Sequence, residues 1–413
     1  MTPNLGGRYS RGMTDELQVL VDDLAKRLNR SVAIDDPDLR LLAHSDHFDE
    51  IDAARIVSIM HRSAGDQATK YSFGLGSREA TDLFFEPPEA AIGQTFGRIG
   101  MSIRRNGHLL GFVWLMGHDS DDLNALRTPL AQAAEVAAVA LERSRTIHML
   151  RLDREFAYVQ GLMSTDRTLR TATVAHVGRE HMLDIEQPVT AVALMSTAFE
   201  PSQHSESDRR AVVAALDAAV LLTKRGMGLR SSIGGSGTLL INCSEIAAAV
   251  DIASAIHAIA VETSGRNHDD WWVGVGNDWP IDDAATALQQ ARHAATAAGA
   301  LRSLGTVVTF EGLGVYGPLT ALPREVLAGS LDRRYLQLAN VKGHRDLLVD
   351  TLEMYLDNAG SVQQTRQLLS IERASLYYRL RRIEEVAGID LNDGNTRLAL
   401  HMSLKMARLL GLR

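Results

Sequence analysis

The amino-acid sequence predicts a multi-domain α/β protein whose last domain is all helical. Segments with the two-residue period of strands alternate with segments of helical period up to about residue 317, and only helical segments follow from about residue 340. The length of 413 residues agrees with two to four domains, and a hydrophobic content of 45% is enough for a sizeable core in each.

Composition narrows the class of protein. The single cysteine, Cys243, excludes an internal disulfide framework and indicates a reducing compartment. The net charge is −8, so the basic residues of a nucleic-acid site must be concentrated locally. The first residues lack an apolar leader, and no run of about twenty apolar residues occurs. We therefore expect a cytoplasmic protein without a membrane span.

The first predicted domain covers residues 13–118. Leucines at helical spacing predict its first helix, and Asn106-Gly107 predicts a tight hairpin near its end because both residues tolerate positive φ. The predicted elements are helix 13–28, strands 31–35 and 40–44, helix 53–62, and strands 98–105 and 108–116. The run G-H-L-L-G-F-V-W-L, residues 107–115, resembles the closing strands of GAF-like sensor domains.

A GAF-like module usually holds a small molecule between its sheet and its helices, in a pocket with apolar walls. The candidates for these walls are Phe73, Phe96, Met101 and Trp114, with Phe84 and Phe85 as further possibilities. Each of them also fits an ordinary core position. His44 and His47 flank Asp46, but two histidines without a second cluster of ligands do not predict a metal site.

A long helix is predicted over residues 119–163, with Pro129 in its first turns, where a missing N–H costs little. Its apolar and small residues recur at near-heptad spacing: Leu126, Leu130, Ala133, Ala137, Ala140, Ser144 and Ile147. Two interpretations fit this stripe. The helix pairs with its copy in a dimer, or it lies along its own domain.

Residues 164–317 form the predicted middle domain. Its elements are strand 189–195, helix 207–224, strands 229–233 and 238–242, helix 245–262 and strand 271–276, followed by helix 283–298 and strand 306–310. The first six have the β-α-β-β-α-β order of a ferredoxin-like fold. The central hairpin, residues 234–238, contains no carboxylate to hold the metal ions of a nucleotide cyclase, and no lysine follows its glycines as in a phosphate-binding loop. We therefore predict neither catalysis nor a cofactor, and expect a structural, dimerising or regulatory domain.

The stretch Ser361–Ile383 within the last domain, residues 340–413, predicts a helix-turn-helix. Ser361 is a suitable N-cap for a short first helix. In the second helix, Leu376, Leu380 and Ile383 share one face, which leaves a basic outer face suited to a major groove. Glu372, Arg373 and Ser375 are the candidates for base edges, and Arg379, Arg381 and Arg382 for phosphates. The alternative is an amphipathic helix whose arginines only meet solvent.

The run Leu347–Leu410 resembles the C-terminal domain of PucR/CdaR-type bacterial transcription regulators. The matching positions are Thr351, Leu352, Tyr355, Leu356, Thr365, Arg373, Leu376, Tyr378, Arg379, Leu380, Arg382, Ile383, Gly388, Asp390, Leu391, Arg397 and Leu400. Ser361, Thr365 and Tyr378 complete the candidate DNA-binding residues. The sequence departs from the family pattern at Glu372, Ala374 and Ser375, and at Arg366. Residues 273–295 and 310–317 resemble the degenerate cyclase-like (GGDEF-like) middle domain of the same family.

The resemblance implies an effector-responsive transcription regulator that binds operator DNA. One helix-turn-helix reads only a half-site, so a homodimer or a higher even oligomer is expected. Asp332–Leu348 is the predicted connection to the last domain, with Gly343 as its hinge. Two alternatives remain: a sensor or enzyme that binds a purine nucleotide or second messenger through the middle domain, and a module whose C-terminal helices bind a protein. The sequence identifies neither the effector nor the operator, nor whether the protein activates or represses.

Overall fold

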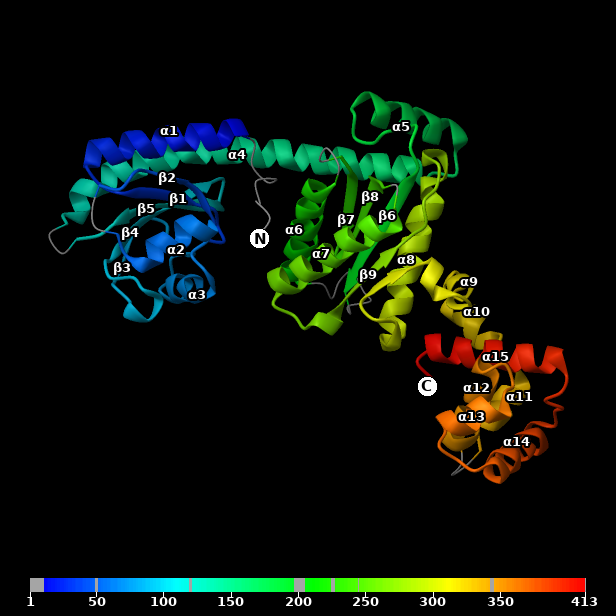
Figure 1. The fold of residues 1–413 in the computed structure, drawn as a ribbon. Coiled ribbons are helices and arrows are strands. Elements are labelled where there is room, and N and C mark those ends of the chain that lie inside the picture. Colours follow the sequence, from blue (N-terminus) through cyan, green and yellow to red (C-terminus); the bar gives the residue numbers. More distant parts are fainter. Residues whose placement is uncertain are drawn as a thin grey trace. The chain divides into compact units, whose positions relative to one another are not determined.

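The computed structural model describes residues 11–48, 51–118, 121–196, 205–223, 227–243, 245–341 and 345–412. The chain divides into two compact units, residues 1–153 and residues 154–413, which are described separately (Figure 1). Helix α4 (Leu123–Leu162) begins in the first unit and ends in the second.

The first unit is a five-stranded antiparallel sheet with helices on both faces. Its elements are α1 (Arg11–Leu28), β1 (Val32–Asp35), β2 (Leu41–His44), α2 (Ala53–His61), α3 (Asp66–Gly74), β3 (Leu83–Glu86), a 3-10 turn (Ala90–Ile92), β4 (Arg98–Arg105) and β5 (His108–Met116). The strand order is β2-β1-β5-β4-β3. The predicted hairpin is confirmed, with φ of 51° at Asn106 and 79° at Gly107. Strand β3 and helix α3 were not predicted.

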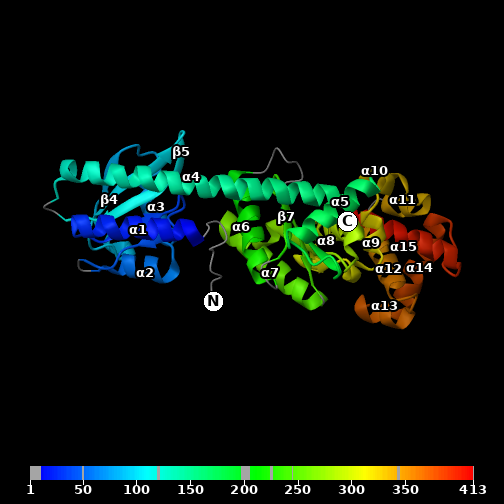
Figure 2. The same ribbon diagram turned by 90° about the horizontal axis from the view of Figure 1, so that it is seen from above.

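Strand alternation decides what each face of this sheet contacts. Val113 and Leu115 of β5 pack with α1 and the first part of α4, which lie on one face (Figure 2). Phe112 and Trp114 lie on the other face, with α2 and α3. The sheet therefore separates two apolar clusters.

The small-residue stripe of α4 packs within the first unit. Leu130, Ala133, Ala137 and Ala140 are buried among the residues of α1 and the sheet, and Ser144 is buried as well. Ile147, one turn further on, is 56% exposed. Up to Ser144 the helix thus lies along its own domain, the second of the two interpretations.

The middle part of the second unit is a second five-stranded sheet. Its elements are α5 (Arg167–Arg179), β6 (Val189–Ser196), α6 (Glu206–Leu222), β7 (Leu229–Ile233), β8 (Ser236–Asn242), α7 (Ile246–Ser264), β9 (Trp271–Val275), α8 (Ala284–Ala300) and β10 (Val307–Thr309), with 3-10 turns at His268–Asp270, Ile281–Asp283, Arg302–Leu304 and Glu311–Leu313. The strand order is β10-β9-β6-β8-β7, and only β10 and β9 pair in parallel. The predicted element order is confirmed; helix α5 was not predicted.

Helices α6 and α7 cover one face of this sheet, and α8 with the end of α4 covers the other. The hairpin between β7 and β8 is tighter than predicted. Strand β8 begins at Ser236, so only Gly234 and Gly235 form the turn, and Gly234 has a φ of 59°. Helix α7 is long and apolar enough to span a membrane by composition, but it packs against α6 and β9 and buries His257 in the domain.

A buried ion cluster attaches the end of α4 to the second sheet. The Arg230 guanidinium on β7 donates from Nε to Glu155 Oε2 on α4 at 2.8 Å, and it also pairs with Asp217 on α6. All three side chains are buried. Two carboxylates thus compensate one guanidinium in the interior.

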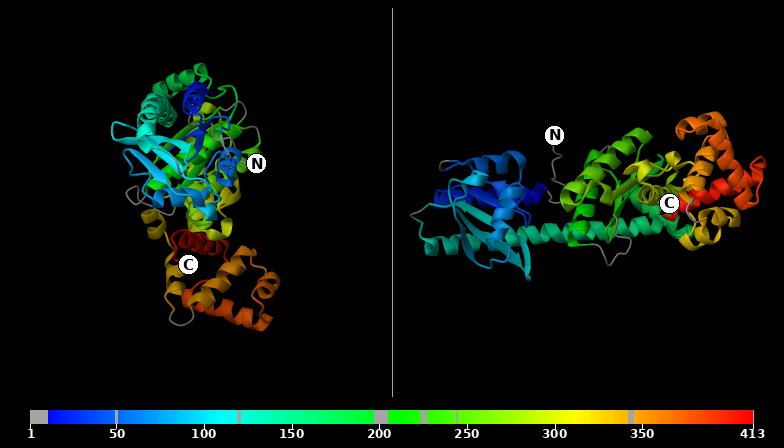
Figure 3. Two further views of the ribbon diagram at one scale, coloured as in Figure 1. Left: turned by 90° about the vertical axis from the view of Figure 1, so that its left-hand side faces the viewer. Right: turned by 90° about the horizontal axis from the view of Figure 1, so that it is seen from below.

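The C-terminal part of the second unit is all helical, as predicted (Figure 3). It contains α9 (Tyr316–Thr320), α10 (Arg324–Gly329), α11 (Arg333–Ala339), α12 (Arg345–Asp357), α13 (Val362–Leu368), α14 (Arg373–Ala387) and α15 (Gly394–Leu409). One apolar core joins α11, α12, α14 and α15. The predicted hinge at Gly343 lies outside the described residues.

Candidate functional site

Helices α13 and α14 form a helix pair with a tight connection. Ser361 caps α13, because its Oγ accepts a hydrogen bond from the Gln364 backbone N at 3.3 Å. The chain leaves α13 through Ser370, whose φ is 52°, and Ile371 N donates to Arg366 O at 3.0 Å. This left-handed residue reverses the chain within four residues, so that α14 begins at Arg373.

The inner face of α14 is the one predicted from periodicity. Leu376, Leu380 and Ile383 are buried against Leu352 of α12 and Leu400 of α15. The spacing of apolar residues on α15 predicts that Leu398, Met402, Leu404 and Leu409 cover this core. Leu404 is buried there as predicted, together with Leu400 and Ala407, whereas Leu398 and Met402 are exposed.

The outer face of α14 is basic and aromatic. Among the predicted DNA-binding residues, the exposed ones are Glu372, Arg373, Ser375, Tyr378, Arg381 and Arg382. Tyr378 is 74% exposed. The Arg373 guanidinium lies over the ring of Tyr377, 5.5 Å from its centre, and donates to its hydroxyl at 3.2 Å. Tyr377 was not predicted; its spacing of four residues from Arg373 on one helix face was the available signal.

Three predicted residues have other contacts. Thr365 is fully buried and its hydroxyl donates to Ser361 O at 2.7 Å, so we no longer assign it a contact with DNA. Arg379 is half-buried and donates from Nη1 to Thr351 Oγ1 on α12 at 3.3 Å. Arg382 is exposed but pairs with Glu385 at 3.1 Å.

Several positions that match the PucR/CdaR pattern support the scaffold rather than the outer face. Arg397 lies over the ring of Tyr355, 5.5 Å from its centre, and donates to its hydroxyl at 3.0 Å. Tyr355 O in turn accepts from the N–H of Gly360, which has a φ of 77°. Close by, Glu384 Oε1 accepts from Leu391 N at 2.9 Å and fixes the connection between α14 and α15.

Helix α15 is also held to α12, α9 and α10. Arg408 contacts both carboxylate oxygens of the buried Glu353, at 2.6 and 2.7 Å. Burial alone would raise the pKa of Asp357, but hydrogen bonds from Lys405 and His401 outweigh it and lower this pKa. On its other side, α15 contributes Met406 and Leu410 to a cluster with α9 and α10.

The predicted effector-pocket residues are brought together only in part: Phe73 and Trp114 share an apolar cluster, whereas Met101 and Phe96 lie elsewhere. A cavity of about 90 Å³ opens on the α2 and α3 side of the first sheet, and only Trp114 of the four residues lines it. Met101 lies on the opposite face because it pairs with Val113, whose neighbour Trp114 points the other way. Phe73 packs under the Arg78 guanidinium, and Phe96 lies near His118.

The lining of this cavity combines apolar residues with four charged ones, more charge than was expected. Asp35, Arg55, Glu86 and Arg98 line it. Burial, with the neighbouring carboxylate of Asp36, raises the pKa of Asp35 to about 7. Burial also raises the pKa of Glu86. Within the part of the chain that the structure describes, no group of three or more His, Cys, Asp or Glu residues is placed to hold a metal ion.

The capped helix pair, with its apolar inner face and its basic outer face, defines a helix-turn-helix domain of the kind that binds double-stranded DNA. Residues 348–406 match the family model of the PucR C-terminal helix-turn-helix domain. The C-terminal part of the chain is thus a PucR-type helix-turn-helix domain.

Three proteins of Bacillus subtilis (strain 168) are similar to the chain. The purine catabolism regulatory protein is 28% identical over 31% of this chain, and the DNA-binding transcriptional activator AdeR is 30% identical over 24% of it. The chain spans about a quarter of the length of each, 24%. The proline-responsive transcriptional activator PutR is 19% identical over 95% of this chain and 97% of its own length. The chain is therefore similar to PucR-type transcription regulators, none of which is named as an enzyme.

Proposed function

We propose that the protein is an effector-responsive transcription regulator that binds operator DNA with helix α14. The observation that carries the proposal is the exposed face of this helix, with Arg373, Tyr378, Arg381 and Arg382, in a domain of the PucR type. In such a complex, residues at the start of α14 contact base edges, and the arginines further along contact phosphates.

The proposal includes a symmetric assembly in the cytoplasm. One helix-turn-helix per chain reads one half-site, so two chains are needed for an operator with two-fold symmetry. The similarity to a regulator named as proline-responsive supports a response to a small molecule. We propose no catalytic role for the middle domain, because its central hairpin, Gly234 to Thr238, offers no carboxylate to a metal.

The domain assignments remain part of the proposal. We assign residues 13–118 to a GAF-like sensor, 119–163 to a linker and 164–317 to a GGDEF-like domain of ferredoxin-like fold. The strand order β9-β6-β8-β7 supports the last assignment. The cavity beside Asp35 and Trp114, which has both apolar and charged residues in its lining, is the candidate sensor site.

A gel-shift titration tests the proposal, with duplexes from the promoters of the protein's own and neighbouring genes and an unrelated duplex of equal length. Wild type is expected to bind one promoter preferentially and more weakly as salt rises. Replacing Arg381 and Arg382 together by Ala is expected to reduce the slope of log K against log salt by about 0.9 for each phosphate that is no longer neutralised.

Two exposed arginines outside the domain, Arg145 on α4 and Arg167 on α5, supply a double-alanine control of equal charge change. The control is expected to bind as wild type does. Equal binding to all duplexes, or an equally weakened binding in both double variants, would contradict the proposal.

A further inference from the structure

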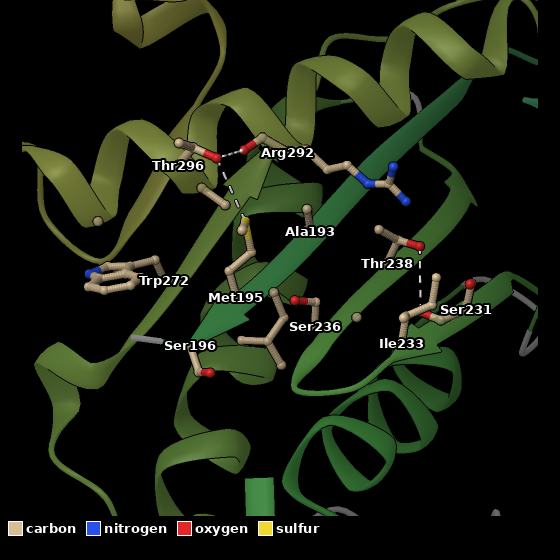
Figure 4. Close-up of a pocket in the computed structure, with 14 residues that line it drawn as sticks. Ala193, Met195, Ser196, Ser231, Ile233, Ser236, Thr238, Trp272, Arg292 and Thr296 are labelled. Atoms are coloured by element: carbon tan, nitrogen blue, oxygen red, sulfur yellow. Dashed lines mark hydrogen bonds between the residues drawn. The ribbon is translucent and has the colours of Figure 1, made fainter. Parts of the chain in front are cut away.

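A cavity with a mixed polar and apolar lining lies in the middle domain, between α8 and the sheet (Figure 4). Its volume is about 410 Å³, within the range of small-molecule sites. It is formed only by residues of β6, β7, β8, β9 and α8. The function proposed above makes no use of it.

The cavity exists because α8 lies close to one side of the sheet and the neighbouring strands carry small side chains. A Cβ on Gly274 of β9 would meet Ala291 O at 2.0 Å, so α8 can approach β9 only at a glycine. On the next strands, Ala193 pairs with Thr238, and Thr238 pairs with Ser231. This row of small residues leaves space beside the helix.

Arg292 of α8 lines this space without a partner. Its guanidinium makes no hydrogen bond or ion pair with any described residue, and no carboxylate lines the cavity. Burial lowers the pKa of Arg292, and no charge acts in the opposite direction. A guanidinium nevertheless stays charged at neutral pH. A half-buried charge of this kind is stabilised by an anion that enters the cavity.

Hydroxyl groups and one aromatic ring complete the lining. Thr238 of β8 pairs with Ala193 and so lies on the face of the sheet that α8 covers, and its hydroxyl donates to Ser231 O at 3.5 Å. Figure 4 shows the Arg292 guanidinium on the side of Thr238, whereas Trp272 lies at the opposite side of the cavity. Met195 pairs with Trp272 across β6 and β9 and lies between these two sides. One side of the cavity is therefore cationic and the other apolar.

We propose that this cavity binds a small organic anion, with a carboxylate or phosphate group on Arg292 and an apolar or aromatic body against Trp272 and Met195. The hydroxyl of Thr238 lies on the Arg292 side of the cavity and is a further polar group available to the ligand. This places a ligand in the middle domain, separate from the sensor site proposed in the first unit.

The site has a direct structural route to the DNA-binding domain. Helix α8 carries Arg292 and contacts both α9 and α15. Tyr316 of α9 is partly buried at this junction, near Lys405 and Glu353, and burial raises its pKa. Helix α15 is part of the helix-turn-helix core. An anion that shifts α8 therefore also shifts its contacts with α9 and α15.

The test uses the full chain and four compounds of similar size: benzoate and phenyl phosphate as anions, benzamide as the neutral analogue and benzylamine as the cation. Thermal unfolding and tryptophan fluorescence are followed in titrations at constant ionic strength. At least one anion is expected to raise Tm and to saturate, with benzamide weaker and benzylamine inactive. The two anions distinguish a carboxylate site from a phosphate site.

Arg292→Met is expected to weaken anion binding on the order of tenfold or more, while Arg292→Lys restores part of it. The exposed Arg167→Met is the matched control and is expected to bind as wild type does. Thr238→Val, which leaves the guanidinium in place, keeps the test decisive if Arg292→Met does not fold. Its expected result is weaker anion binding with an unchanged Tm of the unliganded protein.

The inference is overturned if neither anion binds, if benzamide binds as tightly as the anions, or if the Arg292 and Thr238 variants bind as wild type does. Binding is measured without DNA, so its failure is distinguishable from failure of the gel-shift experiment. A gel shift with and without the bound anion then shows whether occupancy changes the affinity for DNA.

Discussion

The ion cluster around Arg230 and the cavity around Arg292 place the same side chain in opposite situations. Both arginines belong to the second unit, and both are removed at least partly from solvent. Arg230 has two carboxylates, Glu155 and Asp217, whereas Arg292 has none among the described residues. A compensated charge holds elements together, and an uncompensated one beside a cavity is available to a ligand.

The largest change in stability is expected in the ion cluster around Arg230. Glu155→Ala removes a fully buried carboxylate and leaves Arg230 with one partner, so the free energy of unfolding should fall by about 3–5 kcal/mol. Urea unfolding of the full chain measures this change. Arg292→Met should change stability by less than about 0.5 kcal/mol.

Glu206→Ala is the control for the removal of a carboxylate, because Glu206 pairs with Arg209 at the surface. Its expected cost is below about 1 kcal/mol. If Glu155→Ala lowers the free energy of unfolding by no more than Glu206→Ala does, the buried ion cluster does not stabilise the protein more than a surface ion pair.

A buried carboxyl can respond to the lack of a partner in a way that arginine cannot, by staying protonated. The folded-state pKa of Asp35, about 7, lies above its ordinary value of 3.8. The folded state therefore keeps a proton that the unfolded state loses as pH rises. Stability of the first unit should fall between about pH 4 and pH 7, by about 4 kcal/mol at most, and level off above.

Asp35→Asn should remove this fall. Amide hydrogen exchange of β5 peptides in the full chain, corrected for intrinsic rates, reports the stability of the first unit. The same pH dependence in wild type and variant would show that another group is responsible.

Arg379 is intermediate between Arg230 and Arg292, because it is half-buried and its partner, Thr351, is neutral. Arg379→Ala should lower the free energy of unfolding by about 1 kcal/mol and also weaken DNA binding. Arg381→Ala should weaken DNA binding alone, since Arg381 is exposed. Urea unfolding and gel shifts on the two variants separate these effects, and equal stability of both would contradict the bracing role of Arg379.

The smallest effect is expected for Glu385, which pairs with Arg382 at the surface. Glu385→Gln should change stability by less than about 0.5 kcal/mol. It should also strengthen DNA binding, because it releases Arg382 and removes a negative charge near the phosphates. Unchanged or weaker binding would place Arg382 away from the DNA.

Local patterns in the sequence predicted most elements of the fold and the inner face of α14. Leu376, Leu380 and Ile383 identify that face because their spacing follows the helical period. The burial of Thr365 was not predictable in this way, since α13 is only seven residues long and has few apolar residues. Strand β3 and helix α3 were also missed.

Contacts between distant parts of the chain determined the rest of the site. Arg379 meets Thr351 across 28 residues of sequence, and this pairing depends on how α12 and α14 pack. Met101 and Trp114 were predicted to share a pocket, but the register of β4 and β5 places them on opposite faces. The cavity beside Arg292 likewise depends on strand register and on the approach of α8 to Gly274.

Glu372 immediately precedes α14, where it is exposed and makes no side-chain cap hydrogen bond. Its carboxylate opposes the attraction that a helix N-terminus normally exerts on a phosphate. In the proposed complex Arg381 and Arg382 bind the DNA phosphates. The first turn of the helix then discriminates between base pairs. A carboxylate accepts from the cytosine amino group and is repelled by the acceptors of guanine. The regulator would thus recognise its operators as much by rejecting wrong base pairs as by attracting the right ones.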